Sequence, residues 1–314
     1  MPTHKIIVNP VSGRGKGAAS IPLIRQLLES HNLQYDLVQT VRPWHAAELA
    51  QQAVGDGYEV IVSVGGDGTA NEVLNGLMQA KASQPDAALP AAMGILCVGR
   101  GNDFAYGMGV PSDLETGCQV LAQNQRRAVD IGRVTGGDYP QGRYFGNGVG
   151  IGFDAVVGFE ALKMKRLSGF PSYIVAALKT IFLYYQAPEV QVLFDGQDIR
   201  LRALMVSTMN GRRMGGGFMM GPDASPDDGL FDLCIAEQVS RGRIFGLIPH
   251  FMRGTQATQK EVRTARASRL TVQAFQGSLP VHADGETICT HGVQLTLELL
   301  PQQIEMVCQP LDEA

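Results

Sequence analysis

The hexapeptide VGGDGT at residues 64–69 carries the clearest chemical signal in the chain. It follows an apolar run at residues 60–64 and precedes a helix-like stretch at residues 71–77. Glycines in such a turn let the backbone approach a ligand without a Cβ in the way, and the amides that enter a helix attract an anion. Asp67 would be repelled by phosphate, so we expect it to act through a divalent cation or a hydroxyl group. The pattern favours a phosphate-bearing ligand over a plain connecting turn.

Two further glycine-rich loops follow apolar runs in the first half of the chain. The loop at residues 9–15 offers amides, a hydroxyl group and Lys16 to phosphate, but it lacks the Walker A spacing. The loop at residues 99–103 carries Asn102 and Asp103, which suit a ribose, a phosphate-bound water or Mg²⁺; an Asx turn ahead of a helix is the alternative. Thr40 ends another apolar run, where it either contacts a ligand or caps a turn.

Alternating strand and helix patterns position these loops. We predict strands and helices in turn along the chain, at residues 5–8, 18–30, 35–39, 46–54, 60–64, 71–80 and 92–98. Such alternation is typical of a parallel sheet covered on both faces, with ligands at the carboxyl ends of the strands. The three glycine-rich loops should therefore converge on one crevice of a Rossmann-like α/β domain.

The second half of the chain has short β-rich runs punctuated by glycine, which predict an antiparallel β-sandwich. Helical stretches at residues 155–165 and 172–186 interrupt it, with a break at residues 169–171. We expect strands at residues 293–300 and 304–307 to return to the first domain. The predicted boundaries are 1–132, 133–292 and 293–314.

Carboxylates in or near this half suggest further chemistry. Asp228 lies in PDASPDDG at residues 222–229, where it suits a hard cation or a plain Asp-Gly hairpin. Asp284 and Glu286 flank a glycine at a hairpin tip, from which either could serve as a general base or a metal partner. Their neighbour His282 is expected to pack at a strand end. Asp130, near the domain junction, should face a cleft or form an ion pair.

Composition restricts the setting. A net charge of -4 and a pI near 5.9 argue against nucleic acid as a partner. Five scattered cysteines indicate a reducing compartment. No signal-peptide pattern and no membrane-length apolar stretch is present, so we expect a cytoplasmic protein, with peripheral contact at the inner membrane face as a further expectation. Apolar stretches at residues 170–185, beside Lys163, Lys165 and Arg166, and at residues 243–253 are candidate bilayer surfaces or, alternatively, core.

The ordered set of motifs resembles the diacylglycerol kinase catalytic family, specifically its soluble bacterial lipid kinases. The motifs are NPVSG at residues 9–13, GGDGT at 65–69, GRGNDF at 99–104, VDIG at 129–132, GIGFDA at 150–155, NG at 210–211, GGG at 215–217, PDA at 222–224, DG at 228–229 and DGE at 284–286. Together they span nearly the whole chain. GGDGT alone is shared with NAD kinases and resembles a motif of phosphofructokinases.

The resemblance implies transfer of the γ-phosphoryl group of ATP, with Mg²⁺, to a lipid hydroxyl in a cleft between an α/β domain and a β-sandwich domain. It implies nucleotide contacts by Asn9, Pro10, Ser12, Gly13, Thr40, Gly65, Gly66, Asp67, Gly68, Thr69, Asn71, Gly99, Arg100, Asn102 and Asp103. Asp67, Asp103 and Asp130 would surround Mg²⁺ and its waters. A second, structural Mg²⁺ would be held by the Asp228 carboxylate and the backbone carbonyls of Ser225 and Leu230.

The resemblance places the general base in the segment from Asp284 to Glu286, and we favour Glu286. One departure is Arg100, which stands where the family usually has threonine, so a guanidinium replaces a hydroxyl contact to ATP there. The acceptor stays open among diacylglycerol, phosphatidylglycerol, sphingoid bases and ceramide. An NAD kinase and a catalytically degraded nucleotide- or lipid-binding protein are the alternative functions. The oligomeric state is also open, with a homodimer among the options.

Overall fold

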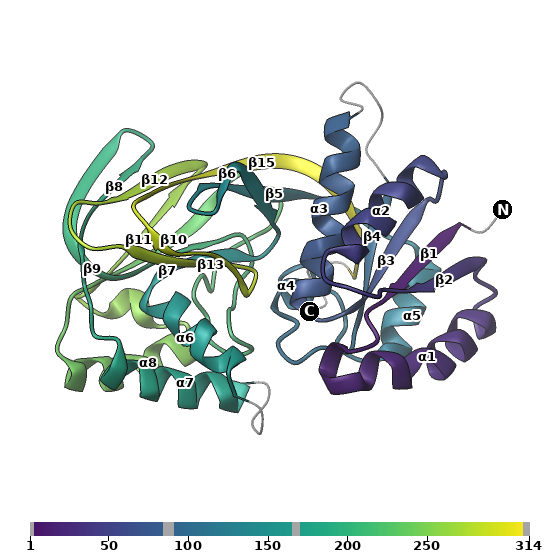
Figure 1. Cartoon of the computed structure of the whole chain (residues 1–314), viewed down its shortest axis with the longest axis horizontal. Helices are drawn as coiled ribbons and strands as arrows, with labels where there is room; N and C mark the ends of the chain where they lie inside the picture. The colour runs from purple at the N-terminus through teal and green to yellow at the C-terminus, as the bar shows by residue number, and fades with distance from the viewer. Residues whose placement is uncertain (1–2, 84–90, 165–169, 310–314) are drawn as a thin grey trace. The chain divides into compact units, whose positions relative to one another are not determined.

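The computed structural model describes residues 3–83, 91–164 and 170–309 (Figure 1). The chain divides into two compact units. Unit 1 comprises residues 1–131 together with 301–314, and unit 2 comprises residues 132–300. Lys165 and Arg166, two of the three basic residues considered for a bilayer surface, lie outside the described residues.

Unit 1 is built on a parallel sheet. Its strands are β1 (His4–Val8), β2 (Tyr35–Gln39), β3 (Val60–Gly65), β4 (Ala92–Cys97) and the end of β15 (Gln294–Val307). The order is β15-β4-β3-β1-β2, and Met306 of β15 lies opposite Met93 of β4 in a parallel pairing. Every residue of β3 and β4 is buried, as expected for strands covered on both faces.

Helices cover both faces of this sheet. α1 (Ser12–Ser30) contacts α5 (Leu114–Gln123), and α2 (His45–Gly55) contacts α3 (Asp67–Ser83), with the short α4 (Asp103–Gly107) following β4. From β1 the chain moves outward to β2, whereas β3 lies on the other side of β1 and leads to β4. Such a reversal of strand order is the position at which open α/β sheets bind ligands. The loops after β1 and β3 flank it.

Unit 2 is an antiparallel β-sandwich. Its strands are the end of β5 (Arg126–Gly136), β6 (Tyr139–Phe145), β7 (Gly148–Gly152), β8 (Glu189–Phe194), β9 (Gln197–Met209), β10 (Phe231–Glu237), β11 (Val262–Ala267), β12 (Arg269–Ala274), β13 (Leu279–Ala283), β14 (Glu286–Gly292) and the first part of β15. The first half of β9 pairs with β8, and its second half pairs with β7 and β10. One long strand therefore serves both layers.

Three helices, α6 (Phe153–Leu162), α7 (Phe170–Leu183) and α8 (Arg241–Arg253), lie along one side of the sandwich in Figure 1, and η1 (Gln256–Thr258) follows α8. Alternation along β10 explains how the sheet is buried on both faces. Leu233 and Ile235 join the core between the layers, whereas Cys234 and Ala236 pack with residues of the three helices. None of the described helices is long and apolar enough to span a bilayer.

The predicted fold class, a Rossmann-like α/β domain followed by an antiparallel β-sandwich, is confirmed. Two details differ. The two strands expected at residues 293–300 and 304–307 form one strand, β15. The helix expected from residue 18 is assigned from Ser12, although the first turns contain left-handed residues at 13–15, with φ of 58°, 63° and 92°. Consecutive left-handed residues are costly without glycine, and two of these three are glycines.

Candidate functional site

The carboxyl edge of the unit 1 sheet brings the three glycine-rich loops together. Asn9, after β1, donates its amide to the Thr69 hydroxyl at 3.0 Å and accepts the amide of Val11 at 3.2 Å. The β3 and β4 loops touch backbone to backbone, because a Cβ on Gly99 would lie 2.3 Å from the Cα of Gly66. Glycine is therefore required at this contact, where the Asn102 side chain also approaches Gly99.

Asp67 fixes the relative position of two loops. One carboxylate oxygen accepts the amide of Asn102 at 2.8 Å and the other accepts the amide of Phe104 at 3.0 Å. Asn102 has a left-handed φ of 54°, and α4 begins immediately after it. As the first residue of α3, Asp67 also lies at the positive end of a helix dipole. Its first role in the fold is to hold the loop that follows β4.

Asp103 lies beside Asp67 at the same loop. A Cβ on Gly101 would lie 2.9 Å from a carboxylate oxygen of Asp67 and 3.4 Å from one of Asp103. The two carboxylates thus flank one glycine, which is an arrangement of hard oxygen ligands that suits Mg²⁺. In the part of the chain that the structure describes, no group of three or more His, Cys, Asp or Glu side chains is placed to hold a metal ion. A cation here would complete its shell with water and phosphate oxygens.

Asp130 lies inside the protein rather than in a cleft. It is fully buried rather than facing a cleft, and its carboxylate accepts the backbone amide of Gln302 at 2.8 Å. Gln302 has a left-handed φ of 49° within β15. A carboxylate in this position holds the returning strand against β5. The structure therefore gives Asp130 a role in joining the two ends of unit 1.

The remaining residues expected at the nucleotide lie in or near the three loops. Thr40 follows β2, is nearly buried, and donates its backbone amide to the Val8 carbonyl at the end of β1. Asn71 is fully buried in α3. Arg100 is exposed. Pro10 is part of the loop after β1, Ser12 and Gly13 begin α1, and Gly68 belongs to the first turn of α3.

In unit 2, the hairpin between β13 and β14 separates the two candidate bases. Asp284 and Gly285 form its two-residue turn with φ of 48° and 82°, as in a type I′ turn. The buried Asp284 carboxylate accepts the amides of residues 146, 147 and 148 at 2.8, 2.9 and 3.0 Å. Both of its oxygens are thus engaged. Glu286, the first residue of β14, is exposed, which leaves its carboxylate able to accept a proton from a ligand.

A polar cluster beneath this hairpin was missed by the sequence analysis. A Cβ on Gly150 would lie 2.4 Å from His282 Nε2 and 2.6 Å from a carboxylate oxygen of Asp154. Ser207 and the Ala155 amide donate to Asp154. Desolvation raises the pKa of Asp154 to about 7 and lowers the pKa of His282 to about 4. The GIGFDA motif marked Asp154, but only strand pairing brings His282 opposite Gly150.

His282 also supports the hairpin that carries Glu286. Its Nδ1 accepts the backbone amide of Gly285 at 3.3 Å, so the neutral ring carries its proton on Nε2. The low pKa of His282 keeps the ring in this acceptor form at neutral pH. The turn is thereby held from both sides, by His282 and by Asp284.

Protein groups already engage Asp228, the carboxylate expected to hold a structural Mg²⁺. One oxygen of the Asp228 carboxylate accepts the Leu230 amide at 3.0 Å, and the other is ion-paired with Arg266. Arg266 lies opposite Asp232 in the β10–β11 pairing, and its Nε lies 3.7 Å from the Asp232 carboxylate. Burial raises the pKa of Asp232, and Arg266 opposes that shift. The Arg266 guanidinium therefore supplies the positive charge next to the carboxylates of Asp228 and Asp232.

Comparison with known proteins agrees with the geometry. The family model of the diacylglycerol kinase catalytic domain matches residues 3–134, and that of the YegS C-terminal NAD kinase beta sandwich-like domain matches residues 147–308. The chain belongs to the diacylglycerol kinase family. As a member it is an enzyme of the lipid kinase class, whose phosphoryl acceptor is an alcohol group. The resemblance expected from the ordered motifs is confirmed.

Relatives of this family member extend over most of its length. A diacylglycerol kinase of Staphylococcus haemolyticus is 28% identical over 311 residues, covering 98% of this chain and 88% of the relative. A diacylglycerol kinase of Staphylococcus saprophyticus subsp. saprophyticus is 26% identical over 283 residues, covering 90% of this chain and 88% of the relative.

Solved structures share the fold. A diacylglycerol kinase from Bacillus anthracis str. Sterne superposes with a TM-score of 0.72 at 20% identity, covering 98% of this chain and 97% of that one. Yeast NADH kinase complexed with NADH gives a TM-score of 0.52 at 12% identity, and the superposition covers 98% of this chain and 84% of the yeast chain. At these identities the likeness concerns architecture alone.

Proposed function

We propose that the protein transfers the γ-phosphoryl group of ATP, bound with Mg²⁺, to the hydroxyl group of a membrane lipid, with diacylglycerol as the first acceptor to test. The observation that carries the proposal is the pair of glycine-rich loops that Asp67 holds together at the strand ends of unit 1. Loops of this kind suit a polyphosphate, because backbone amides can reach it directly. The names of the curated relatives support the choice of acceptor.

The residues of unit 1 fit a nucleotide and its cation. The glycine-rich loops would lie along the phosphates, with the amides of the first turn of α3 donating to them. Asp67 and Asp103 would hold Mg²⁺ through their oxygens and through water. When bound, Mg²⁺ neutralises phosphate charge and aligns the γ-phosphoryl group. Asp130 is left out of this set because it is fully buried against the Gln302 amide.

The residues of unit 2 supply the base. Glu286 would accept the proton of the acceptor hydroxyl. As it does so, the hydroxyl oxygen would form a bond to the γ-phosphorus, and the bond between that phosphorus and the leaving oxygen of ADP would break. Asp284 and His282 would position this glutamate by fixing the turn in front of it. Most of the rate enhancement in such reactions comes from positioning and charge stabilisation, with a base adding roughly 10²- to 10⁴-fold.

Phosphorylation of NAD is the second candidate. Two observations favour it: the match to a sandwich domain described as NAD kinase-like, and the fold shared with yeast NADH kinase. The likeness to the yeast protein is one of fold, whereas the curated relatives named diacylglycerol kinase match this sequence over most of its length. A lipid acceptor therefore remains the first choice.

One assay decides between these activities. Purified protein is given ATP and Mg²⁺ with dioctanoylglycerol in detergent micelles, or with NAD, and the phosphorylated product is separated and quantified. The proposal expects phosphatidic acid and no NADP, with loss of product in Glu286→Gln. NADP formation would overturn it in favour of the second candidate. The absence of both products, in protein that still binds ATP, would require another acceptor.

A further inference from the structure

Helix α7 turns large apolar side chains outward. Val175, Leu178 and Phe182 recur at helical spacing on its exposed face, and Phe182 is 66% exposed. The side of the helix that faces the unit carries five buried residues, Ser172, Ala176, Ala177, Thr180 and Ile181, of which only Ile181 is large and apolar. In the usual amphipathic pattern the larger apolar residues face the core, whereas α7 exposes three of them on its outer side.

Helix α8 continues the same surface. Its buried positions are Ile244, Leu247 and Phe251, but Phe245 and Met252 are 39% and 41% exposed. The rings of Phe182 and Phe245 lie 6.0 Å apart, so the two helices share one apolar face. Of the 13 exposed large hydrophobic side chains among the described residues, five lie on these two helices, which together hold 27 residues. Exposed apolar residues at this density mark an interaction site.

The charged side chains of α7 and α8 are all basic. Neither α7 nor α8 contains a carboxylate, whereas the two helices carry Lys179, Arg241, Arg243 and Arg253 in a chain of net charge -4. Lys179 and Lys163 share the single carboxylate of Glu160 on α6. Arg241 donates to the Ile181 carbonyl in the last turn of α7. The apolar face is therefore bordered by cations.

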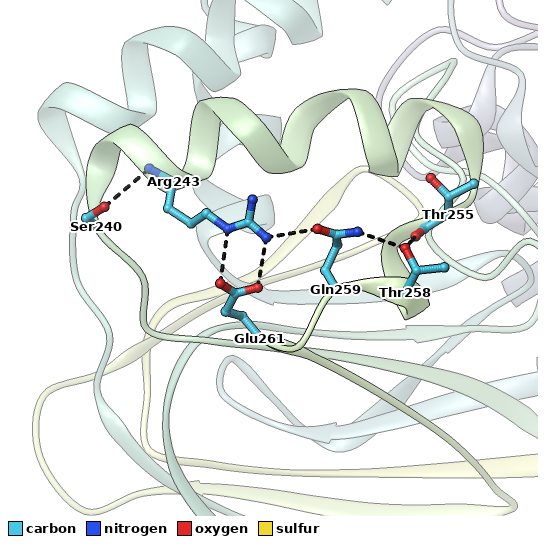
Figure 2. Close-up of polar contacts among 6 residues, drawn as sticks. All are labelled: Ser240, Arg243, Thr255, Thr258, Gln259 and Glu261. Atoms are coloured by element: carbon cyan, nitrogen blue, oxygen red, sulfur yellow. Dashed lines mark hydrogen bonds and ion pairs between the residues drawn. The ribbon is translucent and has the colours of Figure 1, made fainter.

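Polar contacts hold α8 in this orientation. Figure 2 shows Arg243 pointing from α8 toward Glu261, to which it donates two hydrogen bonds of 3.0 Å, and toward Gln259 at 2.9 Å. The Ser240 hydroxyl caps the start of the helix by accepting the Arg243 amide. Arg243 is thus used to fix the helix, and the side that carries Phe245 and Met252 is turned away from these contacts.

We propose that the outer face of α7 and α8, formed by Val175, Leu178, Phe182, Phe245 and Met252, docks on a bilayer containing anionic phospholipid. An apolar face on helices whose charged side chains are all basic is what a surface needs to enter the headgroup region. A second copy of this chain fits less well, because self-association would bring cations together. The inference rests on the proposed function, since a kinase of membrane lipids must reach its acceptor at the bilayer.

Flotation with vesicles tests the docking surface. Full-length protein is mixed with vesicles of phosphatidylcholine alone or of equal parts phosphatidylcholine and phosphatidylglycerol. The wild type is expected to float with the anionic vesicles, and Phe182→Ser/Phe245→Ser should weaken that binding by about tenfold or more. The matched control is Phe275→Ser, which removes a phenylalanine of similar exposure, 44%, that packs on Arg200 in the same unit. It should bind like the wild type.

Turnover of dispersed dioctanoylglycerol separates this inference from the proposed function. If the double variant keeps this turnover and loses both vesicle binding and activity on vesicle-borne long-chain diacylglycerol, the inference is supported. Unchanged vesicle binding in the double variant overturns it, as does sedimentation showing that the substitutions only dissociate a dimer. If the wild type turns over no dispersed acceptor, the proposed function fails, while the vesicle-binding result still decides the inference.

A fluorescence measurement keeps the test valid should the serine variant misfold. The chain has a single tryptophan, Trp44 in unit 1, so Trp44→Phe/Phe182→Trp places one reporter on the proposed surface. Its emission should shift to shorter wavelength with anionic vesicles and be quenched by brominated acyl chains. Trp44→Phe/Phe275→Trp should show neither change. Equal responses at the two positions, or none at position 182, would contradict the inference.

Discussion

The carboxylate of Asp67 accepts the backbone amide of Asn102 across 2.8 Å, although the two residues follow different strands of the sheet. The same carboxylate also accepts the Phe104 amide. The acidic residue of the hexapeptide is thus a structural tie as well as a candidate cation ligand. Loss of this side chain should affect the shape of the site and its charge together.

Asp67→Asn should weaken ATP binding and lower stability at once. An amide side chain can accept only one of the two backbone N–H groups and leaves the other poorly paired, at about 1–3 kcal/mol. We expect a fall in the unfolding temperature and at least a tenfold loss of ATP affinity by isothermal titration calorimetry. Asp56→Asn, an exposed change in the same unit, should alter neither. Unchanged ATP binding in Asp67→Asn would rule out this role for Asp67.

Substitutions in the β13–β14 hairpin should distinguish Glu286, the proposed general base, from Asp284, which holds the turn. Glu286→Gln should reduce kcat by about 10²- to 10⁴-fold with an unchanged unfolding temperature, because its side chain is exposed. Asp284→Asn should lower the free energy of unfolding by about 2–4 kcal/mol, because three backbone amides donate to this carboxylate. Kinase assays and thermal unfolding of both variants give the comparison. A stable, inactive Asp284→Asn beside an active Glu286→Gln would reverse the assignment.

The Asp228–Arg266 ion pair predicts that unit 2 needs no structural cation. In the absence of ATP, the unfolding temperature of the wild type should be the same in Mg²⁺ and in EDTA. Arg266→Gln should cost under about 1 kcal/mol, as for a partly exposed pair, and millimolar Mg²⁺ should restore the loss. Arg263→Gln, which breaks the Arg263–Glu237 pair on the same two strands, should not respond to Mg²⁺. Destabilisation of the wild type by EDTA would refute this.

Asp154 should make stability depend on pH in the direction opposite to most carboxylates. Its pKa is about 7 in the folded protein and 3.8 for an unperturbed group, so the folded state binds more protons between these values and loses stability as pH rises through them. Asp154→Asn removes this pH-dependent contribution to the free energy of unfolding. Its stability relative to the wild type should therefore increase between pH 4 and pH 7 and level off above, by at most a few kcal/mol. A flat difference in urea unfolding across this range would contradict the raised pKa.

His282 titrates over part of the same range with the other sign. Its pKa is lowered to about 4, so its contribution to stability is lost as pH falls from 6.5 toward that value. The two effects partly cancel in the wild type. The measurement on Asp154→Asn should therefore be read as a difference from the wild type at each pH, and Asp154→Asn/His282→Gln compared with His282→Gln gives the Asp154 contribution without the histidine.

The loops of unit 1 could be predicted from sequence because local rules position them. A buried parallel strand places its following loop at one edge of the sheet, so residues after β1, β3 and β4 had to meet. The contacts that define Asp284 could not be predicted in this way, because its partners lie in a turn at residues 146–148, far away in the sequence. Arg266 was missed for a similar reason, since only the register of β10 with β11 brings it to Asp228.

The last strand of unit 1 has a consequence for how the protein is made. Residues 301–307 pair with β4, yet the ribosome adds them after every residue of unit 2. Until then one edge of β4, a strand buried at all six residues, has no partner and can attract other unpaired strands. A gene fragment that stops at Ile131 would leave that edge open permanently. To produce unit 1 alone, the C-terminal strand would have to be rejoined by a short linker in place of unit 2.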